Sequence, residues 1–186
     1  MANLIKCKSC GYVTEEGKAH DVCPACGVPA KMFEPYVDPV SPQRRMILKL
    51  DIHPILVHFT VSFTFSLLIL NIAAFFLKGD LFDDIFTAAR VIAFFLPITV
   101  ILSFAGGLFD GKIRFRKITT PLLKTKILLS IFFFILSITY LMLILKFGFT
   151  GFIWLGIMAS VITAALGLVI ALALIGTSLI EAKFPG

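Results

Sequence analysis

The sequence predicts a small cysteine-rich domain followed by an all-α integral membrane bundle of four helices. Hydrophobic residues make up 59% of the 186 residues, and the mean hydropathy is +0.99. An ordinary soluble domain is roughly 45–50% apolar. The apolar residues gather into long runs beyond residue 51, whereas all four cysteines lie within residues 7–26. Two parts of different character are therefore expected, one soluble and one within a membrane.

The four cysteines form two CxxC pairs separated by twelve residues: Cys7, Cys10, Cys23 and Cys26. At this spacing two tight turns bring four sulfurs around one tetrahedral metal ion. Gly11 and Gly27 each follow the second cysteine of a pair, where a turn requires unusual backbone angles. Residues 1–6 lack the charged start and apolar stretch of a signal peptide, so we expect a reducing, cytoplasmic setting. In that setting thiols bind a metal rather than form disulfides.

The residues around these cysteines resemble a known family. The segments Cys10-Gly11-Tyr12, 23–29 and Phe33-Glu34 are similar to the rubredoxin-like domain that ends rubrerythrins, over about residues 4–34. The resemblance implies one iron ion that switches between ferric and ferrous states and passes single electrons, with Tyr12 packed beside the site. The implied ligands are Cys7, Cys10, Cys23 and Cys26. The diiron helical domain of rubrerythrins is missing, so their peroxidase activity does not carry over.

Zinc is the alternative to iron in this site, because a structural zinc ribbon uses the same four thiolates. We expect His20, between the pairs, to be a surface residue rather than a further ligand. Residues 1–40 carry four lysines and five acidic residues, a net charge of about −1. A nucleic-acid reader has a basic footprint instead. We therefore expect no nucleic-acid partner and favour an electron carrier.

The predicted domains are a rubredoxin-like metal-binding domain at 1–34, a Pro-containing linker at 35–50 and a four-transmembrane-helix domain at 51–186. Prolines make an extended, semi-rigid linker where it is polyproline-like. Four apolar runs each exceed the roughly 20 residues that a spanning helix needs. They lie near residues 52–77, 85–108, 121–146 and 151–180.

The distribution of basic residues predicts the orientation of these helices. One face of the membrane receives ten Lys and Arg residues: Arg44, Arg45, Lys49, Lys112, Arg114, Arg116, Lys117, Lys124, Lys126 and Lys183. The other receives three: Lys78, Arg90 and Lys146. Because the richer side stays inside, both termini are expected to be cytoplasmic, in the cytoplasmic membrane of a prokaryote.

Small residues recur on one stripe of the last apolar run and predict a close-packing helix face. They are Gly156, Ser160, Ala164, Gly167 and Ala171.

The first membrane helix opens with a histidine motif, residues 53–59, HPILVHF. It resembles a bacterial four-helix membrane family of unknown function whose first helix starts HPxxVHF; the run 105–110 also fits, and the likeness spans about residues 52–180. Relatives carry further histidines where this chain has lysines, which weakens any multi-histidine site. Ionisable residues inside membrane helices are commonly functional, so His53 and His58 are candidate ligands of a haem b or contacts of a quinone.

Helical geometry limits that site, because five residues at about 100° each place His53 and His58 some 140° apart. One metal cannot readily bind both from one chain. A haem with one ligand, haems shared across a homodimer, or a quinone remain open. Asp110 is a candidate partner for one imidazole, or it pairs with Lys112 or Arg114.

The sequence therefore favours a membrane-anchored electron carrier with a cytoplasmic redox partner. Such a chain is either a carrier alone or a subunit or variant of a quinone- or haem-linked oxidoreductase. The alternative is a non-redox scaffold in the lipid bilayer whose zinc ribbon docks a cytoplasmic protein. No catalytic residue is predicted.

Overall fold

The computed structural model describes residues 3–18, 21–38, 41–115 and 120–180, and only the backbone of Phe115 and of 178–180. Residues 46–175 form one compact unit, and residues 1–45 belong to another. Several sequence predictions concern residues outside the described part, namely His20, Arg116, Lys117 and Lys183.

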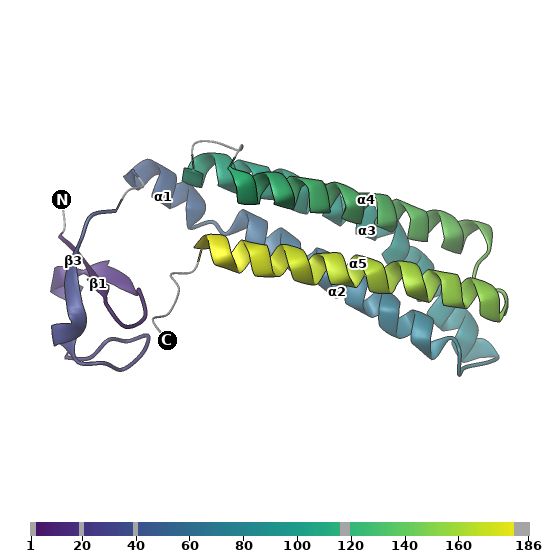
Figure 1. Cartoon of the computed structure of the whole chain (residues 1–186). Coiled ribbons are helices and arrows are strands. Elements are labelled where there is room, and N and C mark those ends of the chain that lie inside the picture. Colours follow the sequence, from purple (N-terminus) through teal and green to yellow (C-terminus); the bar gives the residue numbers. More distant parts are fainter. Residues whose placement is uncertain (1–2, 19–20, 39–40, 116–119, 181–186) are drawn as a thin grey trace. The chain divides into compact units, whose positions relative to one another are not determined.

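The N-terminal unit is a three-stranded antiparallel sheet in the order β2-β1-β3 (Figure 1). β1 spans Leu4–Cys7, β2 Val13–Glu15 and β3 Phe33–Tyr36. Cys7 pairs with Phe33 at one end of β1, so the first ligand is held by a sheet ladder. Two single turns of 3-10 helix, η1 (Glu16–Lys18) and η2 (Ala30–Met32), complete the unit.

The segment predicted as an extended linker contains a short helix, α1 (Pro42–Leu48). Pro42 occupies the first helical position, where its missing amide hydrogen has no helical partner to lose. The Ser41 carbonyl accepts the Arg45 amide at 2.9 Å, and the Arg45 guanidinium pairs with Asp38. Pro42 therefore starts a helix here instead of maintaining an extended chain.

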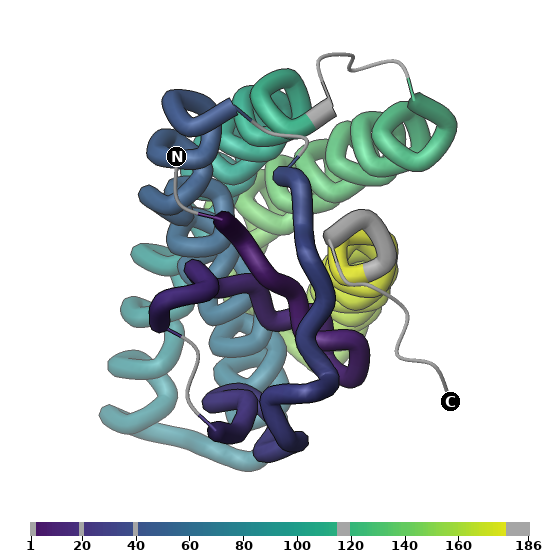
Figure 2. The backbone as a smooth tube through the Cα atoms, turned by 90° about the vertical axis from the view of Figure 1, so that its left-hand side faces the viewer, coloured from purple at the N-terminus to yellow at the C-terminus, as the bar shows by residue number. Residues whose placement is uncertain are grey.

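The second unit contains four long helices that run side by side (Figure 1), and Figure 2 looks along them. α2 spans Ile52–Ala73, α3 Asp80–Phe115, α4 Pro121–Lys146 and α5 Gly151–Ile180. Each is long and apolar enough to cross a membrane. α3 is closest to α2 on one side and to α4 on the other. The fold class predicted from the sequence, a rubredoxin-like knuckle followed by four membrane-spanning helices, is confirmed.

α3 is longer than its apolar run at both ends. Asp80 and Asp83 lie in its first turn and Lys112 and Arg114 in its last. Acidic groups at a helix N-terminus and basic groups at its C-terminus interact favourably with the helix dipole. These charges extend the helix beyond the residues that hydropathy alone predicts.

The core of the bundle draws on all four helices. Its fully buried large side chains are Leu67, Leu96, Tyr140, Ile144, Met158 and Ile162. The small residues predicted as a packing face of α5 are half-buried or exposed, and a Cβ added at Gly156 or Gly167 would meet nothing within 4 Å among the described residues. Larger side chains of α5 face the core instead, because they bury more apolar area.

Aromatic side chains gather at the end of the bundle where the α2–α3 and α4–α5 connections lie. Phe149 packs against Phe86 with ring centroids 5.4 Å apart, and Phe147 stacks on Trp154 at 3.5 Å. Tryptophan concentrates at membrane–water interfaces because its ring system is apolar but carries a polar N–H group, which phenylalanine lacks. Trp154 therefore favours an interfacial position for this end.

Candidate metal centre and membrane histidines

The two CxxC turns fold in the same way. In each, the amide of the first cysteine donates to a carbonyl five residues later, Tyr12 for Cys7 and Val28 for Cys23, both at 2.8 Å. In each, the following glycine donates its amide back to the first cysteine's carbonyl, at 2.9 and 2.8 Å. Gly11 and Gly27 have φ angles of 76° and 75°. Side chains rarely adopt this left-handed region, which explains the glycine after each pair.

These turns bring the four cysteine sulfurs within 4.8 Å of one another. The Sγ atoms of Cys7 and Cys26 are 3.8 Å apart, and those of Cys10 and Cys23 are 3.7 Å apart. A metal–sulfur bond of about 2.3 Å places the corners of a regular tetrahedron about 3.8 Å apart. A disulfide requires about 2.05 Å. The donor set and its spacing therefore fit one tetrahedral metal ion, and the four cysteines form a metal-binding site.

The site is open on one side only. Cys7 and Cys23 are buried, at 0% and 1% exposure, whereas Cys10 is half-buried and Cys26 is exposed. The first cysteine of each turn thus faces the inside of the domain, and the second faces its surface. Groups outside the domain can approach the sulfurs along this edge.

Backbone amides also act on the sulfurs. Burial alone raises the pKa of Cys23, but hydrogen bonds from the amides of Ala25 and Cys26, with the neighbouring thiols, lower it to about 7. The amide of Tyr12 acts to lower the pKa of Cys10, but burial and the three nearby thiols outweigh it and raise that pKa to about 12. Because metal ligation needs thiolates, binding to this set releases protons.

Residues 6–34 match the family model described as the rubrerythrin, rubredoxin-like domain. The match covers all four cysteines and none of the membrane helices, so this part of the chain is a rubredoxin-like domain. No curated protein matches the chain, and no solved structure does. The likeness of residues 52–180 to a four-helix membrane family stays a prediction.

In the membrane unit, His53 is a residue of α2, and its side chain packs against α3. Its Nδ1 is 3.0 Å from the carbonyl oxygen of Ser103. A carbonyl only accepts, so Nδ1 carries the hydrogen and Nε2 keeps its lone pair. A Cβ added at Gly107 would lie 3.0 Å from the imidazole Cε1. The glycine pair in the run 105–110 therefore provides the space in which the His53 ring packs against α3.

Asp110 and Lys126 both lie within electrostatic range of His53. All three side chains are half-buried, and they come from three different helices, α2, α3 and α4. In the sequence, Lys126 is counted only among the basic residues that predict the orientation of the membrane helices. Its signal in the sequence is its position five residues inside α4, a membrane-crossing helix, where a charge is costly.

His58 has a different environment. Its Nδ1 donates to the Pro54 carbonyl of its own helix at 2.6 Å, and the residue is exposed on the outside of the bundle. Its Nε2 also keeps a lone pair. Hydrogen bonding of one imidazole nitrogen to a carbonyl orients the other for ligation. His53 and His58 therefore offer one free nitrogen each, one toward α3 and one on the exposed surface, and they do not share a partner among the described contacts.

Proposed function

We propose that the protein is a membrane-anchored one-electron carrier. It passes electrons between a cytoplasmic redox protein, an iron ion in the four-cysteine site and a quinone or haem b in the membrane domain. The observation that carries the proposal is the open edge at Cys10 and Cys26 of a rubredoxin-like site, in a chain with four membrane-crossing helices. When bound, iron supplies reversible one-electron chemistry.

The chain's own residues adapt the site to this role. Amides of Tyr12, Ala25 and Cys26 point at sulfurs and stabilise their negative charge. Hydrogen bonds to the sulfurs and solvent exposure set the reduction potential of iron–thiolate sites. The slightly acidic domain favours a partner with a basic docking face, because complementary charge speeds encounter.

A quinone, with its quinol form, is the better supported redox partner in the membrane. Reducing a quinone to a quinol takes two electrons and two protons, and the carboxyl of Asp110 and the ammonium of Lys126 offer exchangeable protons near His53. The free Nε2 of His53 can accept a hydrogen bond from a quinol hydroxyl. Haem b would instead need a strong protein ligand, and the exposed His58 would supply one only to a haem held at the bundle surface or between two copies of the chain.

The first test is metal analysis with an optical spectrum of the full-length protein, expressed in iron-replete, haem-supplied cells. We expect one iron per chain and visible iron–thiolate absorption that bleaches on reduction. A Cys7→Ser variant should lose that absorption. Colourless protein with one zinc per chain and no haem would overturn the proposal.

The second test uses proteoliposomes that contain a quinol. We expect the quinol to bleach the iron–thiolate absorption in wild type and in His58→Phe, and His53→Phe to slow bleaching about tenfold or more. Iron content serves as the control, because both histidine variants leave the four-cysteine site intact. If His58→Phe alone abolishes both bleaching and a haem Soret band, haem is the membrane cofactor and the quinone assignment is wrong.

The second candidate function is a non-redox membrane scaffold with a structural zinc ribbon. The sulfur spacing of 3.7–3.8 Å suits zinc as well as iron, so it is compatible with this second function. It predicts that replacing Cys7 and Cys23 abolishes capture of a cytoplasmic partner while electron flow in membranes is unchanged.

The proposed location is the cytoplasmic membrane with both termini inside, which the bias of Lys and Arg residues supports. Protease added to sealed inside-out vesicles should remove the N-terminal domain, and protease added to intact spheroplasts should leave it. The reverse pattern contradicts the orientation.

A further inference from the structure

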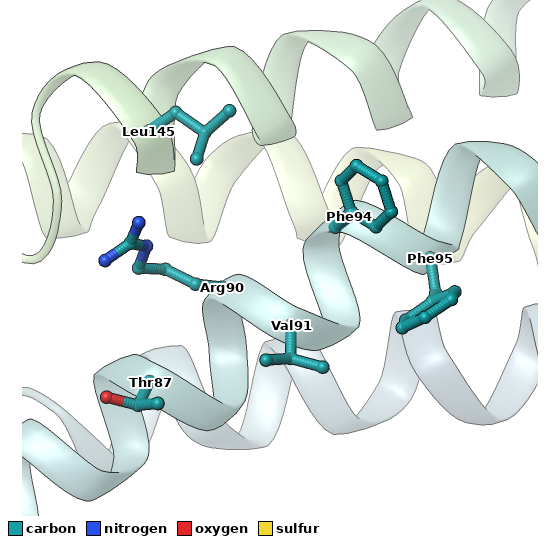
Figure 3. A pocket seen from close by; sticks show the side chains of 6 residues that line it. All are labelled: Thr87, Arg90, Val91, Phe94, Phe95 and Leu145. Carbon is teal, nitrogen blue, oxygen red and sulfur yellow. The ribbon is translucent and has the colours of Figure 1, made fainter.

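A groove between α3 and α4 combines an apolar lining with one cation. It has a volume of about 340 Å³ and is lined by five α3 residues and one α4 residue: Thr87, Arg90, Val91, Phe94, Phe95 and Leu145 (Figure 3). Val91, Phe94 and Leu145 are each more than half exposed, so the groove opens outward from the bundle. In a membrane, that face meets lipid.

Arg90 is the charged residue of this groove. Figure 3 shows its side chain extending from α3 toward Leu145 on α4. Its guanidinium lies 5.5 Å from the centre of the Phe86 ring. Among the described residues, no carboxylate is within ion-pair distance of it. Asp83 and Asp84, on the same helix, lie about 10 Å away along the axis.

The depth of Arg90 matches a lipid headgroup. Arg90 and Asp110 are the charged residues that bound the uncharged stretch of α3, and they stand twenty positions apart. At 1.5 Å per residue this is about 30 Å, the thickness of the hydrocarbon core. Trp154, which stacks on Phe147 near the same end of the bundle, supports an interfacial position.

We propose that this groove binds an anionic phospholipid, with its phosphate on Arg90 and an acyl chain along Val91, Phe94 and Leu145. The planar guanidinium can donate two parallel hydrogen bonds to two oxygens of one phosphate. Lys146, directly after Leu145, adds a second positive charge at the same end. A zwitterionic headgroup is disfavoured because its ammonium is repelled by these cations.

The chain contains its own reporter for this site. Its single tryptophan, Trp154, stacks on Phe147. Phe147 follows Leu145 of the groove by two residues. Brominated lipids quench tryptophan fluorescence at short range. The full-length protein is reconstituted in phosphatidylcholine vesicles with a minor fraction of brominated phosphatidylglycerol. In a second sample the phosphatidylcholine is brominated instead. Comparing the quenching of Trp154 in the two samples gives the relative affinity of the two lipids.

We expect a preference of about fivefold for phosphatidylglycerol, the size given by one interfacial cation. Arg90→Gln should remove most of this preference and leave only what Lys146 contributes, and Arg90→Lys should retain most of it. Lys78→Gln, which removes a charge in the α2–α3 connection outside the groove, should leave it unchanged. Gel filtration and helical circular dichroism check that each variant is folded.

Three results overturn the proposal. In the first, Arg90→Gln keeps the wild-type preference. In the second, Lys78→Gln loses as much as Arg90→Gln, so the preference comes from general surface charge. In the third, 10 mM inorganic phosphate abolishes the preference at constant ionic strength, so the site takes a free phosphate group and not a lipid.

Discussion

At the scale of single residues, substituting Gly27 tests whether the metal-binding turn requires a positive φ angle. Gly27 has φ 75°, and an added Cβ would meet nothing within 4 Å, so only backbone strain opposes a side chain there. Gly27→Ala should destabilise the metal-loaded domain by about 1–2 kcal/mol. Thermal loss of the metal–thiolate absorption measures this.

Gly17 is the matched control for that substitution. It also has open space around an added Cβ, but its φ is not in the left-handed region. Gly17→Ala should therefore leave the midpoint unchanged or raise it, because alanine restricts the unfolded chain. An equal loss in both variants would mean that the turn geometry is not the cause.

Gly107 tests how His53 is held. A Cβ there would lie 3.0 Å from Cε1 and 3.3 Å from Nδ1 of His53, closer than side chains normally pack. Gly107→Ala should displace the ring, break its bond to Ser103 and cost about 1–3 kcal/mol. Thermal unfolding in detergent and the quinol bleaching rate measure the two effects.

The control for Gly107 is Gly156→Ala on α5, where an added Cβ meets open space. It should leave bleaching unchanged and should not lower the unfolding midpoint, because alanine is favoured over glycine inside a helix. If Gly107→Ala lowers stability and leaves bleaching unchanged, His53 packs the helices together and has no part in electron transfer.

At the scale of elements, Asn71 and Tyr140 connect α2 to α4. Both side chains are fully buried, and the Tyr140 hydroxyl lies within reach of Asn71. Neither makes a hydrogen bond of normal geometry among the described residues. Polar groups inside a membrane bundle stay only where they find one another or water.

The Asn71–Tyr140 pair predicts a non-additive mutant cycle. Tyr140→Phe should cost about 0.6–1.7 kcal/mol, because it removes the hydroxyl that lies within reach of the buried Asn71 amide. The double variant Asn71→Leu, Tyr140→Phe should be closer to wild type than the sum of the single variants. Unfolding in mixed micelles measures the cycle, and additive losses contradict the pairing.

The elements differ in how far the sequence predicts them. Uncharged runs and CxxC spacing determine the fold class, because membrane solvation and metal ligation each impose strong local patterns. α1 was missed because a proline can start a helix as well as interrupt one. The outward position of Gly156 and Gly167 was missed because small residues suit contact with any neighbour, and spacing does not say which.

The candidate site was predictable to a similar extent. Four thiolates at fixed spacing carry their own geometry, so Cys7 and its partners could be grouped from sequence. The proximity of Lys126 to His53 depends on how α2 and α4 pack, and no local pattern encodes that packing. The hydrogen bond from His53 to the Ser103 carbonyl likewise joins residues fifty positions apart.

At the scale of the whole molecule, the two units have different sources of stability. In the described part of residues 1–38, the buried apolar side chains are those of Cys7 and Cys23. A domain this small without a larger core depends on its metal, since metal binding supplies the folding free energy. In the described part of the helical unit, fifteen buried residues form one core, which needs no metal.

Metal removal should therefore unfold one unit and spare the other. A strong chelator should expose the N-terminal domain to protease and remove the metal–thiolate absorption, while helical circular dichroism and the detergent melting midpoint of the bundle stay unchanged. A Cys7→Ser, Cys23→Ser variant should show the same pattern without chelator, and wild type reloaded with iron or zinc should regain protection. If the bundle melts at a lower temperature in both metal-free samples, the two units fold as one and their stabilities are coupled.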